Sequence, residues 1–352
     1  MTSHTFRMID ANINRISEGL RVLEDMARFV LADAGLTERL KGVRHGVRKE
    51  IGSMHGNLLS ARDAVNDPGV PISATTVLDG KENISDLTAA NFKRVQEGLR
   101  VVEESLKITG EKDLSKFYER SRFTVYTVEK TYQDALYRFI RRNVLDTDLY
   151  GITSEMHSLG RANVQVVEEM LAAGMGIIQY REKEKSMGDK YRECMAIREL
   201  TRQAGARFIV NDHVDLALMV AADGIHIGQD DLPIDKVREL VGESMAIGIS
   251  THSPDQARAA KADGADYIGV GPIFRTHTKK DVCDPVGLDY LDYVVAHIDL
   301  PFVAIGGIKE TNIREVRAHG ARCIAMVTEI VGAPNIQEKI ACLRQQAENI
   351  ND

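Results

Sequence analysis

The sequence predicts an α/β protein in two parts: an all-α domain with an internal pseudo-twofold repeat over residues 1–142, followed by a (β/α)8 TIM barrel over residues 143–352. Three observations support this prediction. The length of 352 residues is sufficient for two domains. Helical periodicity continues up to about residue 142. Beyond residue 148, short apolar runs alternate with stretches of helical length, which is typical of α/β proteins.

The helical part contains one motif twice. The segment "ANINRISEGLRVLED" (Ala11 to Asp25) recurs as "ANFKRVQEGLRVVEE" (Ala90 to Glu104), with nine of the fifteen aligned positions identical. Apolar residues spaced i, i+3, i+4 predict a helix in each copy. A glycine within a helix costs about 1 kcal/mol relative to alanine. The paired Gly19 and Gly98 therefore predict a point where two helices cross closely.

A second helical segment follows each copy, with Thr37 and Ser115 as its expected N-caps. Between the copies, residues 61–83 are rich in proline, glycine, aspartate and asparagine, which predicts a loop.

The second part contains eight apolar runs with the composition of buried β-strands: "LYGIT", "GIIQYRE", "FIVND", "GIHIG", "AIGIS", "YIGVGP", "FVAIGG" and "CIAMVT". Apolar strands alternating with helices indicate a parallel sheet covered on both faces. Eight such units match a closed barrel, whose chemistry lies at the carboxyl ends of its strands. An open doubly wound sheet is the alternative, but no GxGxxG follows the first strand.

Composition excludes several classes of function. A net charge of −7 and a pI near 5.9 do not favour a nucleic-acid or anionic-membrane partner. Without a signal-peptide core or an apolar run of about 18 residues, we expect a cytoplasmic protein that does not span a membrane. The four cysteines lack metal-ligand spacing and are expected to be reduced thiols. The sequence leaves open whether the chain forms a homo-oligomer.

Polar residues follow the predicted strands and should meet at one mouth of the barrel. The basic and amide groups suit a polyanion, and the two carboxylates could share Mg²⁺ with its phosphates. The glycine pair and the turn after strand eight could bind a separate monophosphate through backbone N–H groups. The residues expected at this mouth are Gln179, Arg181, Lys183, Asn211, Asp212, Asp231, Ser250, Thr276, Thr278, Lys279, Gly306, Gly307, Val327 and Thr328.

Each group also has a structural interpretation. A basic residue in a loop can be solvated or ion-paired, and the glycine pair can be a tight turn. Asp212 and Asp231 can cap the helices that follow them. The functional interpretation rests on basic groups, amide donors and two acids occurring together.

The motifs "YREK", "NDHVDLAL", "ADGIHIGQDD", "IGISTHS", "GADYIGVGPIFRTHTKKD" and "AIGGI" resemble the thiamine-phosphate synthase family, in that family's order, over roughly Asp148 to Leu343. The resemblance implies that a hydroxymethylpyrimidine diphosphate condenses with a thiazole phosphate, giving thiamine phosphate and pyrophosphate.

The resemblance also implies roles for individual residues. Arg181, Lys183, Lys279 and Ser250 would be catalytic, and Asp212 and Asp231 would bind Mg²⁺. The substrate-binding residues would be Gln179, Asn211, Thr276, Thr278, Gly307, Val327 and Thr328. A thiazole tautomerase-like barrel, which needs no metal-binding acids, is the nearest alternative. An inactive barrel acting as a binding module is another.

The helical half, roughly Phe6 to Tyr137, resembles a domain fused ahead of this synthase in some bacteria and suggested to be a hydroxymethylpyrimidine phosphate kinase. It contains no GxxxxGK[ST] loop and no protein-kinase signature. Polar residues shared by both copies form the candidate site: Asn12, Arg15, Glu18, Asn91, Arg94 and Glu97. The alternative is a non-catalytic dimerisation or scaffold module.

Overall fold

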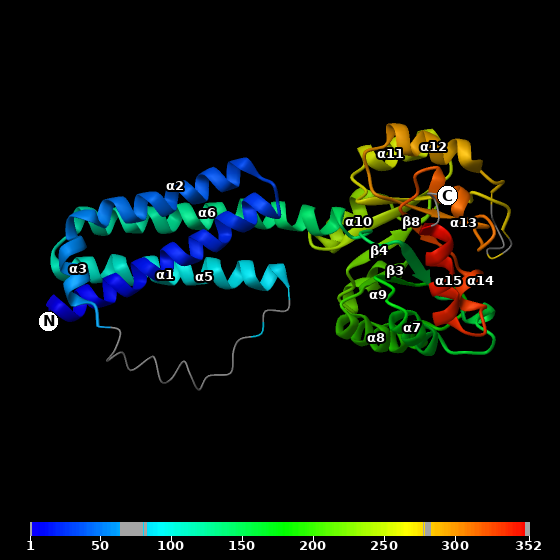
Figure 1. The fold of residues 1–352 in the computed structure, drawn as a ribbon, viewed down its shortest axis with the longest axis horizontal. Coiled ribbons are helices and arrows are strands. Elements are labelled where there is room, and N and C mark those ends of the chain that lie inside the picture. The colour runs from blue at the N-terminus through cyan, green and yellow to red at the C-terminus, as the bar shows by residue number, and fades with distance from the viewer. Residues whose placement is uncertain (1, 64–79, 81–82, 277, 279–282, 349–352) are drawn as a thin grey trace. The chain divides into compact units, whose positions relative to one another are not determined.

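The computed structural model describes residues 2–63, 80, 83–276, 278 and 283–348. The chain divides into two compact units, Met1–Tyr137 and Arg138–Asp352. The first unit is helical and the second contains the barrel, as the sequence predicts (Figure 1). Helix α6 (Lys112–Arg142) begins in the first unit, and its last residues belong to the second.

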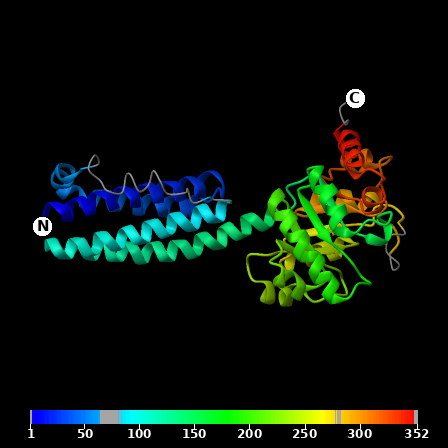
Figure 2. The same cartoon turned by 90° about the horizontal axis from the view of Figure 1, so that it is seen from below.

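Long helices that run beside one another build the first unit, as Figures 1 and 2 both show. Its elements are α1 (Thr2–Phe29), α2 (Ala34–Glu50), the 3₁₀ turn η1 (Ile51–Met54), α3 (His55–Ala61), α5 (Ile84–Thr109) and α6. The two copies of the repeated motif lie on α1 and α5. Most of the predicted loop over residues 61–83 lies outside the described residues.

Helices α1 and α5 cross at their paired glycines, which confirms the close crossing predicted from the sequence. A Cβ atom on Gly19 would lie 2.8 Å from Val95 Cγ2, and one on Gly98 would lie 2.7 Å from Ile16 Cγ1. Ile16 and Val95 hold equivalent positions in the two copies. The two contacts are therefore related by the pseudo-twofold symmetry, and any side chain larger than hydrogen would force the facing side chain or the helix itself to move.

Both expected N-caps are wrong. Helix α2 is capped by Asp33, whose Oδ1 accepts a hydrogen bond from the backbone N of Leu36 at 2.9 Å. Thr37 lies within the helix and donates its hydroxyl to the Asp33 carbonyl. Ser115 lies within α6 and donates to the Glu103 carbonyl at 3.0 Å. Both residues lie inside their helices rather than at the position before the first helical residue, where an N-cap accepts from the free N–H groups.

Glu103, on α5, is buried within a cluster of basic side chains. Its side chain is 1% exposed and accepts from Arg100 Nη1 at 2.8 Å, Lys107 Nζ at 3.2 Å and Arg122 Nε at 3.2 Å. Burial raises the pKa of Glu103, but the hydrogen bond from Lys107 and the charges of Arg100 and Arg122 lower it below its ordinary value. The ionised carboxylate therefore stabilises the packing of α5 on α6.

We expect Glu103→Gln to lower the free energy of unfolding of the helical unit by about 2 kcal/mol, because a buried charge cluster loses its anion. Since folding lowers the pKa of Glu103, its contribution is present above the unfolded pKa of about 4.3 and is lost as pH falls through the folded pKa. The difference in the free energy of unfolding between the variant and wild type should therefore become smaller in acid. Urea unfolding followed by circular dichroism at several pH values measures this.

Glu104→Gln is the matched control for this experiment. Glu104 contacts the same Arg100 and Lys107 at 2.9 Å, but its side chain is 47% exposed. We expect its replacement to cost less than about 0.5 kcal/mol. Equal losses in the two variants would contradict a special role for the buried carboxylate.

The second unit is a closed barrel in which every neighbouring pair of strands is parallel, in the order β1 to β8. This arrangement excludes the open doubly wound sheet. The strands are β1 (Leu149–Ile152), β2 (Ile177–Tyr180), β3 (Arg207–Asn211), β4 (Gly224–Ile227), β5 (Ala246–Thr251), β6 (Tyr267–Val270), β7 (Phe302–Ile305) and β8 (Cys323–Ala325).

Helices surround the strands in both views (Figures 1 and 2). They are α7 (Asn163–Ala172), α8 (Met187–Ala204), α9 (Val214–Met219), α10 (Ile234–Val241), α11 (Pro254–Ala262), α12 (Gly287–His297), α13 (Ile313–Ala318), α14 (Thr328–Val331) and α15 (Ile336–Glu348), with the 3₁₀ turn η2 (Glu155–His157) after β1. None of the helices in the described part of the chain is long and apolar enough to cross a membrane.

The barrel has two hydrophobic cores because successive side chains of a strand face opposite sides. Ile178 and Phe208 belong to the core between the strands and the helices. Ile177 and Ile209 belong to a separate cluster with residues from other strands, inside the barrel. This alternation places the polar residues of the strands in the barrel interior and at its mouth.

The end of α6 is bound to the barrel within the second unit. Arg141 donates Nε to Asp266 at 2.9 Å and Nη1 to Glu243 at 2.6 Å. Asp266 also accepts from the backbone N of Ile247, in β5, at 2.9 Å. The last turn of α6 is therefore part of the barrel unit.

Candidate active site

The structure places predicted site residues at one mouth of the barrel. Gln179 lies on β2, Arg181 and Lys183 directly follow β2, Asn211 ends β3, and Ser250 lies on β5. Because all eight strands are parallel, their carboxyl ends meet at the same mouth. Groups from three strands are thus brought to the same mouth.

Asp212 and Lys183 form an ion pair at this mouth. Lys183 Nζ lies 2.7 Å from Asp212 Oδ2. Asp212 has a φ of 63°, an unusual left-handed conformation for a residue other than glycine. Burial raises the pKa of Asp212, but the hydrogen bond and charge of Lys183, with contributions from Asp231 and Arg181, lower it below its ordinary value. Asp212 is therefore ionised at neutral pH, with two cations and a second carboxylate nearby.

Neither acid caps a helix, so the capping interpretation is wrong for both. His213 precedes α9 and Pro233 precedes α10, and neither helix has a side-chain cap. Asp231 Oδ2 instead accepts from the backbone N of Gly228 at 2.6 Å, within the turn after β4. Each carboxylate is held by a loop at the mouth rather than by the helix behind it.

This donor set fits a magnesium ion that completes its shell with substrate oxygens. Mg²⁺ is usually held by one or two carboxylates together with phosphates and water. Among the residues that the structure describes, no group of three or more His, Cys, Asp or Glu side chains is arranged to hold a metal ion. The described residues thus contain no site in which three or more of these side chains could hold a metal ion. Asp212 and Asp231 instead provide two carboxylates, which is the arrangement that Mg²⁺ shares with substrate phosphates.

A chain of hydrogen bonds crosses the barrel interior between two predicted site residues. Gln179 Nε2 donates to Tyr150 Oη at 3.0 Å, and Tyr150 Oη lies 3.1 Å from Tyr267 Oη. Tyr267 Oη lies 3.2 Å from His226 Nδ1, and His226 Nε2 lies 3.0 Å from Ser250 Oγ. The chain orients both the Gln179 amide and the Ser250 hydroxyl.

The sequence analysis did not predict that Tyr150 and Tyr267 take part in this chain of hydrogen bonds. His226, on β4, links Tyr267 to Ser250 through its two ring nitrogens. A tyrosine at a strand position that faces the barrel interior is the signal that could have identified Tyr150 and Tyr267. This signal can be used only when it is known which strand residues face inward.

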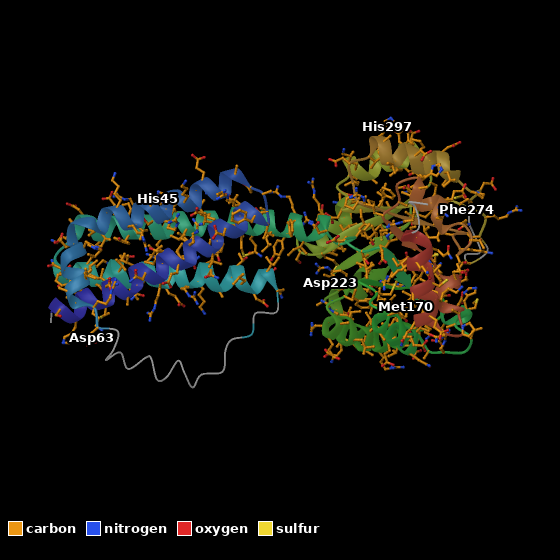
Figure 3. The ribbon with its side chains drawn as sticks, viewed as in Figure 1. His45, Asp63, Met170, Asp223, Phe274 and His297 are labelled. Carbon is orange, nitrogen blue, oxygen red and sulfur yellow. The ribbon has the colours of Figure 1, made fainter. Side chains whose placement is uncertain are left out.

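Two glycines after β7 contact the segment that follows β6. Gly306 and Gly307 have φ values of 98° and 66°. The Gly306 carbonyl accepts from the backbone N of Phe274, labelled in Figure 3, at 2.9 Å. A Cβ on Gly307 would lie 2.6 Å from the Arg275 carbonyl oxygen. The glycines are therefore required both by their backbone conformation and by close approach.

The segment after β6 contains the two predicted threonines. Thr276 Oγ1 and Thr278 Oγ1 lie 3.2 Å apart. Lys279, predicted to be catalytic, lies outside the described residues. Val327 and Thr328 are found where β8 leads into α14. The positions of Gly307, Val327 and Thr328 after β7 and β8 match the usual phosphate-binding region of TIM barrels.

The closed parallel barrel, with cations, paired carboxylates and glycine-lined turns at one mouth, defines a phosphate-handling TIM-barrel enzyme. A Thiamine monophosphate synthase family model matches residues 149–330, which is more than half of the chain. The chain belongs to the thiamine-phosphate synthase family, a family of transferases acting on small molecules.

Individual relatives agree with this membership. Thiamine-phosphate synthase of Pelotomaculum thermopropionicum is 67% identical over 201 residues, covering 57% of this chain and 92% of that protein. Thiamine-phosphate synthase of Gloeobacter violaceus is 40% identical over 329 residues, covering 93% of this chain and 92% of that protein. The solved structure of a thiamine phosphate pyrophosphorylase from Pyrococcus furiosus has a TM-score of 0.54 and 36% identity, covering 60% of this chain and 99% of that chain.

The helical unit has its own family match. A ThiD2 family model matches residues 7–131. The resemblance expected for this half of the chain is therefore confirmed, and the tautomerase alternative for the barrel is not favoured.

The six polar residues proposed for the helical unit have different surroundings. Asn12 and Asn91 are buried, and each donates to the carbonyl four residues earlier in its own helix, at 2.9 Å and 2.8 Å. Arg15, Arg94 and Glu97 are exposed. Glu18 is also exposed and lines a groove between α1 and α2, whereas the other five do not line this groove.

Proposed function

We propose that the mouth of the barrel condenses hydroxymethylpyrimidine diphosphate with thiazole phosphate through the residues predicted from the sequence. The observation that supports this assignment is the cluster of Lys183, Arg181, Asp212 and Asp231 at the mouth to which β2 also brings Gln179 and β5 brings Ser250. It combines cations for a diphosphate with carboxylates for Mg²⁺.

In the proposed reaction, the bond between the pyrimidine methylene carbon and the diphosphate oxygen breaks, and its electron pair leaves with pyrophosphate. The lone pair of the thiazole nitrogen then forms the new C–N bond. Arg181 and Lys183 would donate hydrogen bonds to the leaving group and stabilise its growing charge. Lys183 is 53% exposed, so its side chain can exchange Asp212 for a diphosphate oxygen.

Gln179 and Ser250 would orient the substrate. Gln179 uses its amide N–H on Tyr150, so its carbonyl oxygen is available to accept from the amino group of the pyrimidine. Ser250 Oγ, held by His226, would bind the diphosphate with Asn211 and Lys279. Such preorganisation lowers the cost of bringing the two reactants into line.

Asp212 and Asp231 would hold Mg²⁺, which supplies positive charge against the pyrophosphate oxygens. On the other side of the mouth, Thr276 and Thr278, with backbone N–H groups of Gly307, Val327 and Thr328, would bind the thiazole phosphate. Two anion sites then hold the two reactants close together.

The direct test incubates the full chain with both substrates and Mg²⁺ and measures pyrophosphate release. We expect release that stops on chelation and resumes when Mg²⁺ is restored. Folded protein that releases no pyrophosphate in Mg²⁺ would overturn the proposed reaction.

Asp231→Asn provides a sharper test of the metal site. Because the site would lose one of two carboxylates, we expect the Mg²⁺ concentration for half-maximal activity to rise at least about tenfold. Asp230→Asn is the control, since Asp230 is an exposed neighbour with the same charge. The assignment of Asp231 fails if both variants need the same Mg²⁺ concentration as wild type.

We further propose that the helical unit phosphorylates hydroxymethylpyrimidine phosphate to the diphosphate that the barrel consumes. The match to the ThiD2 family model supports this, together with the chemical continuity between the two steps. A dimerisation or scaffold role is the alternative.

Comparing the full chain with a chain starting at Arg138 tests this proposal, because the shorter chain keeps the Arg141 contacts of the barrel unit. Given pyrimidine monophosphate, ATP and thiazole phosphate, only the full chain should form thiamine phosphate. Given the diphosphate, both should form it. A full chain that is active with the diphosphate but not with the monophosphate and ATP would contradict a kinase role.

A further inference from the structure

The helical unit has a groove of about 390 Å³ between α1 and α2. Its lining residues come from the repeated motif on α1 and from the exposed side of α2: Ser17, Glu18, Arg21, Val22, Arg44 and Arg48. Figure 3 labels His45 on α2, next to Arg44. Three of the six lining residues are arginines, although the chain as a whole is acidic.

Buried polar groups hold the arginines in place. Arg44 Nε donates to Glu24 Oε2 at 2.8 Å, and both side chains are largely buried. Arg21 Nη1 lies 3.4 Å from the other oxygen of Glu24. Arg48 Nε donates to Ser17 Oγ at 3.0 Å. Arg21 Nε also pairs with Asp25 Oδ2 at 3.1 Å, and Arg44 Nη2 lies 3.5 Å from His45 Nε2. Each guanidinium has five N–H groups, so each keeps N–H groups for a ligand, and its planar fork suits phosphate oxygens.

The second copy of the repeat shows which part of this arrangement packing requires. On α5, Glu103 binds Arg100 and Arg122, as Glu24 binds Arg21 and Arg44. The buried glutamate with two arginines is thus common to both copies and is explained by helix packing.

Arg48 has no counterpart in the second copy. Tyr126 stands at the corresponding position on α6, and its hydroxyl accepts from Arg122 Nη1 at 3.2 Å. The Arg122 guanidinium also lies 4.8 Å from the centre of the Phe123 ring. Aromatic side chains therefore cover the arginine in the second copy. The first copy instead has an additional arginine whose only hydrogen bond or ion pair, among the described residues, is with Ser17.

We propose that this groove binds the phosphate group of a small phosphorylated ligand. The identity of the ligand rests on the proposed kinase function, which offers pyrimidine monophosphate and ATP as sources of that phosphate. Glu18 lies in the same groove and would accept a hydrogen bond from an amino group on the ring, and Val22 offers an apolar contact. Inorganic phosphate has neither an amino group for Glu18 nor an apolar surface for Val22, so it should bind more weakly.

The test measures binding of pyrimidine monophosphate, ATP and inorganic phosphate to the full chain by titration calorimetry. We expect Arg21→Ala and Arg48→Met each to raise the dissociation constant of the ligand about tenfold or more, because each variant loses a charge-assisted contact. Arg48→Lys keeps the charge and should recover part of the affinity. The ligand affected identifies the source of the phosphate.

Arg100→Ala is the matched control. Arg100 corresponds to Arg21 in the second copy, with a side chain 54% exposed against 51%, and it pairs with the equivalent buried glutamate. It should destabilise the helices as much as Arg21→Ala without affecting binding. Unfolding curves check that the helical unit is folded in every variant, and synthase activity with the diphosphate checks that the barrel is intact.

The outcomes separate this inference from the proposed kinase function. Ligand binding that is weakened only by the groove variants supports the inference, even if no phosphoryl transfer occurs and the kinase proposal fails. Phosphoryl transfer and binding that are unaffected by Arg21→Ala and Arg48→Met overturn the inference and leave the kinase proposal intact. Failure of all three probes to bind also overturns it.

Discussion

Replacement of Lys183 by methionine is expected to lower the rate of thiamine phosphate formation by a factor of about 100 or more, since a cation facing the leaving group contributes several kcal/mol to such a step. Methionine keeps the length of the side chain and removes the ammonium group that lies 2.7 Å from Asp212 Oδ2. The effect should fall mainly on kcat, because the charge of pyrophosphate grows as the bond breaks.

Steady-state pyrophosphate release over a range of both substrates measures this effect. Arg192→Met removes a positive charge from α8, where the side chain is 73% exposed and pairs with Asp189. It should leave kcat within about twofold of wild type, since exposed ion pairs contribute little. If Lys183→Met retained full activity, Lys183 would serve only to balance Asp212.

Replacement of Gly307 by alanine is expected to raise the KM for thiazole phosphate by about tenfold or more. The added Cβ would lie 2.6 Å from the Arg275 carbonyl oxygen and 2.7 Å from that of Phe274. It must therefore displace the segment leading to Thr276 and Thr278, on the opposite side of the proposed phosphate site. One methyl group thus disturbs both the Gly307 turn and the segment that contains the two threonines. A substrate group displaced by about 1 Å can react about 10²-fold more slowly.

Gly205→Ala separates backbone strain from this clash. Gly205 has a φ of 67°, against 66° for Gly307, and a Cβ there would meet no atom within 4 Å. It should lower stability by about 1 kcal/mol without changing the KM for either substrate. Equal KM values in the two variants and wild type would show that Gly307 does not contribute to a phosphate site.

Much of the barrel and its mouth could be predicted because the information is local in sequence. A parallel strand buried on both faces is a short apolar run, so the eight strands were visible without a structure. Residues that directly follow a strand, such as Arg181 and Asp212, are carried to the mouth by topology alone. Their motifs also carried the resemblance to the thiamine-phosphate synthase family, which the comparisons confirm.

The connection between Gln179 and Ser250 could not be predicted in the same way. It depends on which strand residues face inward and on the distances between side chains from five different strands. Tyr150 and Tyr267 look like ordinary core residues in the sequence. Their hydroxyl groups acquire a role only when closure of the barrel brings them within 3.1 Å of each other.

In the helical unit, the repeated motif by itself determined the helices, their duplication and the glycine crossing, because periodicity and a missing side chain are local properties. Tertiary structure alone decided the use of its polar residues. Asn12 and Asn91 bond within their own helices, whereas Glu18 lies in a groove completed by Arg44 and Arg48 from α2. The physical reason is that a binding surface is formed by side chains from separate helices, and only packing determines which of them meet.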